Sequence, residues 1–483
     1  MPAAPINPDT GSTEETWHPA RLIPVAGIKG QEEQERRATS VLLAVMKAVP
    51  KFGYALVVPL GAPRGRMSTF AEIQLKDADG RTHIPDGAIL VERGNKQWRA
   101  LVEVKTGRAE LTGEQVTRYM EMARDHDFDC LITISNQISS GVDDSPVSID
   151  RRKMRRVKMF HLSWWAIVTE AVLQHRFRGI DDPDQAWILG ELIAYLDHEN
   201  SGAGGFQDMG ERWVRVRDSA RQGTLRAADP EVRVIAERWD HFLDYLALGL
   251  SQDLGREAVP ARPKGETVSA RSDALVAQLA TAGELIGGLR VPDTIAPLDL
   301  RVDLRTRQVT TSVRVAAPAD GRPSAQLNWI LRQLRQASPD LRLGAAFTNS
   351  RETTSNLVGE ARDLPQRCLH PNDPKKRIRS FEIAMTRQMG LKRGKGTGSF
   401  VRETRRQVLD FYGEVVQDLK AWQAKAPQLR EAKGDVPRTA QPDPPPFSAI
   451  DERDLGEGIA PRDDPSASET VSSPGPATSE HPA

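Results

Sequence analysis

Apolar and polar positions in the first part of the chain predict a helix followed by short strands. Between residues 31 and 49 the apolar side chains recur at helical spacing, and Pro50 closes the segment. Turn signals such as Asp79-Gly80 and Gly94-Asn95 then separate four β-like runs, at residues 54–60, 70–75, 84–91 and 98–104. These runs predict an antiparallel meander.

The pattern after the meander predicts a helix, a buried strand and further helices. A helical pattern covers residues 112–124, and apolar residues fill a strand at 129–135. Another strand is predicted at 157–164, with helices at 166–175 and 184–196. We expect one domain over residues 27–200, in the order helix, meander, helix, strand.

A second folded unit is expected after a helical bridge at residues 201–268. Residues 269–424 have an α+β pattern whose role the sequence does not indicate. Its predicted elements are helices at 274–286 and 324–336, strands at 298–304, 309–315, 341–347 and 381–385, a helix from 354 and a last helix at 400–422. Residues 1–26 and 425–483 are rich in proline and lack periodic apolar positions, so we expect a disordered leader and a disordered tail.

Composition excludes several classes of protein. Among 483 residues there are only 2 cysteines, too few for a disulfide framework or a structural zinc site. No apolar run approaches the roughly 20 residues of a membrane span, so we expect a cytoplasmic protein without membrane contact.

The 66 basic and 66 acidic residues balance overall, but residues 431–483 hold 11 acidic against 4 basic residues. The remainder is therefore mildly basic, which permits a polyanionic partner.

Three charged residues at two neighbouring predicted strands form the strongest chemical signal. Asp86 begins one strand, and Glu103 and Lys105 project from the same face of the next because side chains alternate along a strand. If the strands pair, two carboxylates and an amine converge. Carboxylate oxygens suit Mg²⁺ or Mn²⁺, and a lysine beside the metal can orient or deprotonate water and offset charge during phosphodiester hydrolysis.

Asp86, Glu103-Val104-Lys105 and Gln115-x-x-x-Tyr119 together resemble the motifs of the PD-(D/E)xK nuclease superfamily, in its RecB-like branch. The resemblance covers residues 28–178 and implies an α/β restriction-endonuclease-like core. It implies that Asp86, Glu103 and the Val104 carbonyl bind the metal and that Lys105 is catalytic. Gln115 and Tyr119 would contact DNA, and Glu35, or secondarily Glu32, would add a carboxylate from the first helix. Residues 83–137 are also similar to actinobacterial proteins, a similarity that implies no activity.

Two basic segments are candidate nucleic-acid contacts. Residues 151–158 contain Arg151, Arg152, Arg155 and Arg156, which either clamp a DNA backbone or form a solvated connector neutralised by nearby aspartates. The glycine-rich residues 390–399 lie in a second basic segment but are one residue short of a phosphate-binding P-loop. We therefore expect no nucleotide cofactor.

The sequence thus predicts a Mg²⁺-dependent deoxyribonuclease, in genome defence, repair or a stress response. An alternative is a nucleic-acid-binding or scaffold protein that keeps the nuclease fold without turnover. A third interpretation is that the second unit senses a ligand or partner and gates the first. Endonuclease or exonuclease action, DNA or RNA as substrate, and oligomeric state stay open.

Overall fold

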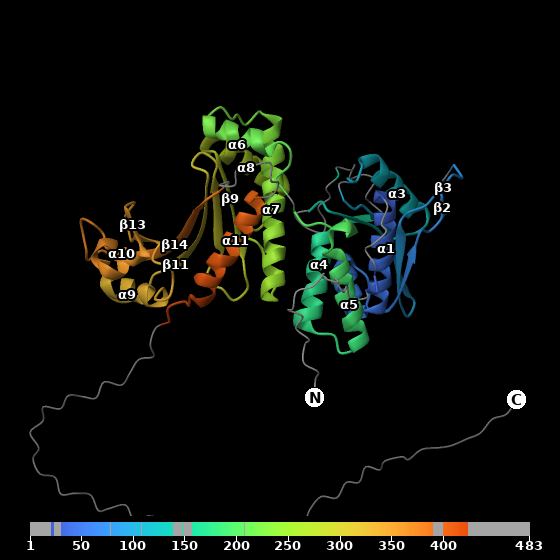
Figure 1. Cartoon of the computed structure of the whole chain (residues 1–483), viewed down its shortest axis with the longest axis horizontal. Helices are drawn as coiled ribbons and strands as arrows, with labels where there is room; N and C mark the ends of the chain where they lie inside the picture. The colour runs from blue at the N-terminus through green and yellow to red at the C-terminus, as the bar shows by residue number, and fades with distance from the viewer. Residues whose placement is uncertain are drawn as a thin grey trace, which may run out of the picture. The chain divides into compact units, whose positions relative to one another are not determined.

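A computed structural model of the chain describes residues 21–23, 30–77, 79–107, 109–138, 147, 157–206, 208–389 and 399–423. These residues belong to one compact unit, residues 1–424, of mixed α/β structure (Figure 1). Most of the leader, the whole tail, the basic residues 151–156 and the glycine-rich residues 390–398 lie outside the described residues. The predicted domain boundaries stay predictions.

The first sheet has five strands in the order β1-β4-β5-β6-β7. Strands β1, β4 and β5 pair antiparallel, whereas β5, β6 and β7 run parallel. The turn at Gly94, which has a positive φ of 57°, closes the β4–β5 hairpin as expected. Its strands are β1 (Arg66–Ala71), β4 (Gly87–Arg93), β5 (Lys96–Val104), β6 (Cys130–Ser135) and β7 (Lys158–Ser163); β2 (Leu75–Lys76) and β3 (Thr82–His83) form a separate hairpin at Asp79-Gly80.

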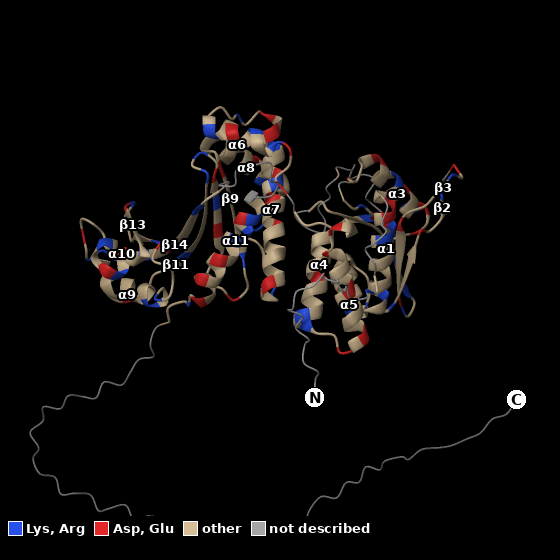
Figure 2. Cartoon of the chain, in the orientation of Figure 1, with Lys and Arg blue, Asp and Glu red and all other residues tan. Residues whose placement is uncertain are grey.

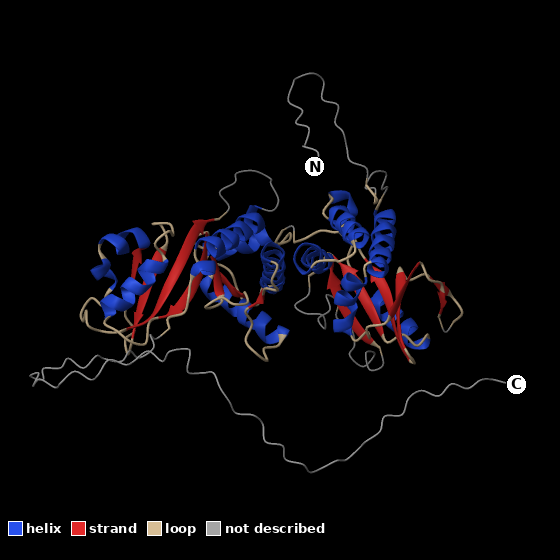
Figure 3. Ribbon diagram, turned by 90° about the horizontal axis from the view of Figure 1, so that it is seen from below, coloured by secondary structure: helices blue, strands red, loops and turns tan. Residues whose placement is uncertain are grey.

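Helices cover both faces of this sheet (Figure 3). One face carries Val102 and Val104 and packs on α1 (Gln31–Ala48), α2 (Pro50–Val57), α4 (Trp164–Val172) and α5 (Pro183–Leu196). The opposite face carries Leu101 and packs on α3 (Gly113–Asp125). The expected order of helix, antiparallel strands, helix and strand is present. The 3-10 helices η1 (Val58–Leu60) and η4 (Glu199–Ser201) and the π-helix η3 (Leu173–Arg178) adjoin these helices.

The predicted strand at residues 54–60 is wrong, because this segment is the helix α2 followed by the turn η1. Pro50 occupies the first turn of α2, where its missing N–H leaves no helical hydrogen bond unmade. Phe52 and Leu56, four residues apart, are buried against α1 and α4. Pro50 therefore ends one helix and begins the next.

The second sheet has seven antiparallel strands in the order β13-β12-β14-β11-β10-β9-β8. Its strands are β8 (Val259–Pro260), β9 (Glu284–Arg290), β10 (Leu298–Asp303), β11 (Gln308–Ala316), β12 (Arg342–Phe347), β13 (Thr353–Leu357) and β14 (Ile378–Gln388). The associated helices and turns are α6 (Trp213–Gln222), α7 (Pro230–Leu254), α8 (Val268–Ala282), α9 (Pro323–Gln333), α10 (Val358–Asp363), η5 (Pro365–Cys368), α11 (Ser399–Glu414) and η6 (Val416–Asp418).

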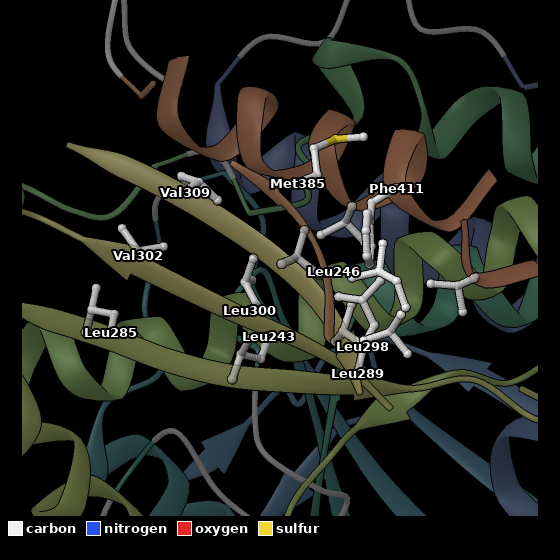
Figure 4. Close-up of a cluster of buried hydrophobic side chains, with 14 of the residues drawn as sticks. Leu243, Leu246, Leu285, Leu289, Leu298, Leu300, Val302, Val309, Met385 and Phe411 are labelled. Atoms are coloured by element: carbon white, nitrogen blue, oxygen red, sulfur yellow. The ribbon is translucent and has the colours of Figure 1, made fainter. Parts of the chain in front are cut away.

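Helix α7, which lies within residues 201–268, contributes to the core of the second sheet. Its side chains Leu243 and Leu246 lie among Leu285, Leu298 and Leu300 of the strands, as Figure 4 shows. Trp239 of α7 is fully buried and donates its indole N–H to the carbonyl of Ile286. The apolar positions of α7 thus complete the core of the second sheet.

Two other expectations for the second unit are wrong. The helix predicted at 274–286 ends at Ala282, because Gly283 takes a positive φ of 71° and turns the chain into strand β9. The helix predicted from residue 354 begins as strand β13, which pairs with β12. In both places a short strand adjoins a helix, and the apolar positions of the two together resemble those of one longer helix.

Basic and acidic residues are intermingled over the elements (Figure 2). In the described part of the chain no single helix is both long and apolar enough to cross a membrane. Together, α1 and residues 50–60 are long and apolar enough for a membrane span. However, the two helices are bent by 110° relative to each other and contribute many buried core residues.

Candidate active site

The backbone brings the three charged residues to one edge of the first sheet. Gly87, which begins β4, pairs with Val102 near the end of β5. Asp86 therefore precedes β4 beside the end of β5, where Glu103 and Val104 are the last two residues of the strand and Lys105 follows directly. Because β5 runs parallel to β6 and β7, this edge is also the carboxyl end of the parallel strands, where open α/β sheets commonly bind ligands.

Direct hydrogen bonds connect the predicted residues. The carboxylate of Asp86 accepts the N–H of Val104 at 2.7 Å. The ammonium of Lys105 donates to Glu103 at 2.9 Å and to Glu35 of α1 at 3.4 Å. Glu35, the first candidate from the predicted helix, thus reaches the site. Glu32 does not reach it by any described contact, and instead pairs with Arg36 at the exposed surface.

Helix α3 supplies the amide and the phenol that were predicted. Thr112 caps its amino terminus by accepting the N–H of Gln115, which fixes where the helix begins. The side-chain amide of Gln115 then donates to Oε1 of Glu103. Tyr119 lies one turn later and is largely buried beside Leu101 and Met120. Gln115 therefore contacts the site directly, and Tyr119 forms part of the packed wall behind it.

Burial and mutual repulsion disfavour the ionised forms of the carboxyl groups of Asp86 and Glu103. Burial raises the pKa of Asp86, although the hydrogen bond from Val104 opposes this. Burial, and next the nearby charge of Asp86, raise the pKa of Glu103 to about 8. Perturbed carboxyl groups of this kind are common at functional sites, although buried ion pairs produce them as well.

Lys105 stays positively charged in this setting. Burial disfavours its charge, but the carboxylates of Glu103, Glu35 and Asp86 outweigh that effect and raise the pKa of Lys105. Its backbone is fixed on both sides, because its N–H donates to the carbonyl of Ile134 and its carbonyl accepts the indole N–H of Trp164. The ammonium group is thus held as a cation beside two carboxyl groups.

The donor set fits a hard divalent cation in part. Oε2 of Glu103 is buried and has no hydrogen-bond partner, which is an unfavourable position for a carboxylate oxygen unless a cation or a proton joins it. Among the described residues, however, no three His, Cys, Asp or Glu side chains are arranged to hold a metal ion together. Mg²⁺ commonly binds through one or two carboxylates and keeps several waters, so Asp86 and Glu103 are sufficient protein side chains for it.

Sequence reasoning missed a row of buried polar residues beside Glu103. Thr133 of β6 is the register partner of Glu103, and His161 of β7 is the register partner of Thr133. The ring of His161 contacts Thr133 Oγ1 at 3.0 Å through Nδ1 and the carbonyl of Gln137 at 2.8 Å through Nε2. Alternation along residues 158–163 places His161 on the α3 face with Met159, but only the strand pairing links it to Glu103.

Asn136 was also missed. Its side-chain amide donates to the carbonyls of Gly107 and Gly202, and its oxygen accepts the N–H of Gly204. It therefore ties the loop after Lys105 to the segment that leads toward α6. A lone asparagine after a strand gives no signal of this role in the sequence.

Other predicted candidates lie elsewhere. Arg151, Arg152, Arg155 and Arg156 are outside the described residues. His83 pairs with Asp77 at 2.8 Å in the small β2–β3 hairpin. Cys130 is buried in β6, and burial raises the pKa of its thiol, which is typical of a core residue rather than a nucleophile.

Comparison with known proteins gives no match for this chain: no protein-family model, no curated protein and no solved structure is similar to it.

Proposed function

We propose that the chain is a metal-dependent nuclease with a restriction-endonuclease-like core, and that it hydrolyses phosphodiester bonds of DNA. The order of helix, antiparallel strands, helix and parallel strand supports this assignment of the core. The motifs Asp86, Glu103-x-Lys105 and Gln115-x-x-x-Tyr119 support the activity. Both arguments concern the same end of β5.

One observation carries the proposal: a lysine ammonium and two carboxyl groups meet at the carboxyl end of β5, with one buried carboxylate oxygen unpartnered. A structural ion pair has no need for the second carboxyl group. Burial, and next repulsion by Asp86, raise the pKa of Glu103, so the proximity of the two carboxyl groups opposes stability unless a cation or a proton joins them. A site for a cation and a phosphate accounts for the grouping.

Each residue of the site has a distinct role in the proposed hydrolysis. Asp86, Glu103 and the Val104 carbonyl would hold Mg²⁺ or Mn²⁺, which would lower the pKa of a water molecule and neutralise phosphate charge. Lys105, kept protonated by its neighbours, orients the nucleophile or stabilises the additional negative charge on the phosphate rather than accepting a proton. Gln115 orients Glu103, and Glu35 holds Lys105 in place.

Cleavage of linear and circular DNA, single- and double-stranded, tests the proposal. The purified chain is incubated with Mg²⁺, with Mn²⁺ or with EDTA, beside Glu103→Ala and Lys105→Ala. Lys96→Ala is the matched control, because Lys96 is an exposed lysine at the opposite end of the same strand. We expect metal-dependent cutting by wild type and Lys96→Ala, and a loss of at least about a hundredfold in the two site variants.

Two results would contradict the proposal. Cutting by Lys105→Ala at the wild-type rate removes Lys105 from the mechanism. Absence of cutting on every DNA, together with DNA binding that persists in EDTA and is unchanged by Asp86→Ala, favours the alternative of a binding or scaffold protein.

A further inference from the structure

An open pocket of about 360 Å³ lies beside Asp86, on the side away from β5. Helix α1 forms one wall, and the end of β1 forms the other. Its lining includes Glu33, Arg36, Arg37, Ser40, Glu72 and Asp86. The pocket thus adjoins the candidate active site through Asp86, which lines the pocket and accepts the N–H of Val104 in the site.

The wall opposite α1 is fixed directly to Asp86. Ala71, the last residue of β1, pairs with Gly87, and the N–H of Glu72 donates to the carbonyl of Asp86 at 3.0 Å. Glu72 itself has a φ of 51°, a left-handed conformation that is unfavourable for a residue other than glycine. The backbone therefore holds the Glu72 side chain at the pocket against a local preference.

The basic residues of the pocket are held by carboxylates. Arg36 pairs with Glu72 at 2.9 Å across the pocket and with Glu32 at 3.3 Å along α1, and Arg37 pairs with Glu33 at 2.8 Å. The side chain of Arg36 remains 62% exposed in spite of this pairing. A planar guanidinium at this position can bind the oxygens of a phosphate in the same way that it binds the carboxylate of Glu72.

We propose that this pocket is a subsite for a backbone phosphate of the DNA strand, adjacent to the phosphate at Lys105, in which Arg36 binds the phosphate and Glu72 occupies Arg36 until DNA replaces it. The proposal rests on the proposed function for the position of the reacting phosphate. Ser40 lies one helical turn from Arg36 on α1 and adds a hydroxyl group that can donate to the same phosphate. Any polyanion that binds Arg36 must first displace the carboxylate of Glu72.

DNA binding by the full chain tests this subsite without requiring catalysis. The probe is a short fluorescein-labelled single-stranded oligodeoxythymidine, and its anisotropy is measured in EDTA over a series of salt concentrations. Arg36→Ala should weaken binding roughly tenfold at low salt and reduce the slope of log K against log salt by about 0.7, the value for one phosphate contact on a single strand. Arg36→Lys should restore part of the loss.

Two further variants make the test specific. Arg93→Ala is the matched control, because Arg93 is an exposed arginine at the tip of the β4–β5 hairpin, away from the site. Its salt slope should equal that of wild type. Glu72→Gln keeps the size of the side chain and removes the nearer of the two carboxylates that pair with Arg36, so the oligonucleotide should bind a fewfold more tightly than to wild type.

The outcomes separate this inference from the proposed nuclease. Binding that depends on Arg36, with no cutting under any condition, supports the subsite and contradicts the nuclease. Cutting by a protein whose binding is the same in Arg36→Ala and Arg93→Ala supports the nuclease and overturns the subsite. No binding of the oligonucleotide by wild type, or weaker binding by Glu72→Gln, also overturns the subsite.

Discussion

The indole N–H of Trp164 donates to the main-chain carbonyl of Lys105 at 2.9 Å, although the two residues are 59 positions apart in the chain. Trp164 is fully buried at the start of α4, directly after β7, and Ser163 caps that helix. Lys105 comes directly after β5. The hydrogen bond therefore connects the first residue of a core helix to the residue that carries the ammonium group of the candidate site.

Replacement of Trp164 by phenylalanine should impair the site more than the fold. The ring still fills most of the space, but the carbonyl of Lys105 loses its donor, which costs about 1–3 kcal/mol. We expect a cleavage rate reduced about tenfold with a KM close to wild type, since the ammonium is displaced while the rest of the proposed DNA-binding surface is retained. A cleavage rate equal to that of wild type would show that this hydrogen bond does not position Lys105.

The raised pKa of Glu103 predicts a pH-dependent stability in EDTA. The ordinary pKa is 4.5 and the folded-state pKa is about 8, so the folded state binds the proton more tightly than the unfolded state. The stabilising contribution of the protonated group is complete below about pH 4.5 and is lost as the pH rises toward 8. Glu103→Gln lacks this titration.

Urea denaturation in EDTA measures the free energies of unfolding of wild type and of Glu103→Gln as a function of pH. Between pH 5 and 8 the free energy of unfolding of wild type should fall relative to that of Glu103→Gln, and above pH 8 the difference should be constant. Parallel curves for the two proteins over the whole range would show that Glu103 has an ordinary pKa.

Metal binding should release a proton at neutral pH. Mg²⁺ requires the ionised carboxylate, and the pKa of Glu103 of about 8 means that this group is mostly protonated at pH 7 without metal. Calorimetric titration with Mg²⁺ in two buffers of different ionisation enthalpy should therefore show release of somewhat less than one proton per ion. Glu103→Ala should bind Mg²⁺ far more weakly, and proton release that persisted in this variant would assign it to another group.

Gln115→Ala tests the contact between α3 and Glu103. The side-chain amide of Gln115 is half-buried and donates to Oε1 of Glu103, so its removal leaves that carboxylate with Lys105 as its remaining described donor. We expect roughly a tenfold loss of cleavage rate with a melting temperature within a few degrees of wild type. Arg118→Ala, an exposed change on the same helix, is the control and should cleave at the wild-type rate.

Leu300→Ala tests the core of the second sheet. Leu300 of β10 is almost fully buried among residues of α7 and the neighbouring strands, so its truncation should lower the free energy of unfolding by about 2–5 kcal/mol. Arg301→Ala, one residue later on the exposed face, should change it by less than about 1 kcal/mol. Equal effects in denaturant titrations would contradict the packing of β10.

The local part of the site could be predicted from the sequence, and its long-range part could not. Alternation along β5 places Glu103 and Lys105 together because it depends only on neighbouring residues. The contact of Thr133 with His161, and the hydrogen bond from Trp164 to Lys105, depend on which strands pair and on where α4 begins. No spacing in the sequence encodes those pairings directly.

The difference between local pattern and long-range packing also explains which predicted elements of the fold were wrong. Residues 54–60 have an apolar run that suits a strand, and the helix α2 forms because its buried face packs on α1 and α4. Residues 284–290 continue the apolar run of α8, and Gly283 is the one local sign that a strand follows. Short apolar runs do not distinguish helix from strand until their tertiary partners are known.

The tip of the β4–β5 hairpin is the part of the first sheet most distant from Asp86 along these two strands. Arg93 pairs with Lys96 there, and Gly94 and Asn95 between them are exposed. A tag, a fluorophore or a short loop inserted at this turn extends the hairpin away from the site and leaves its register intact. The chain therefore offers an attachment point for immobilisation or single-molecule tracking on DNA that keeps both chain ends free.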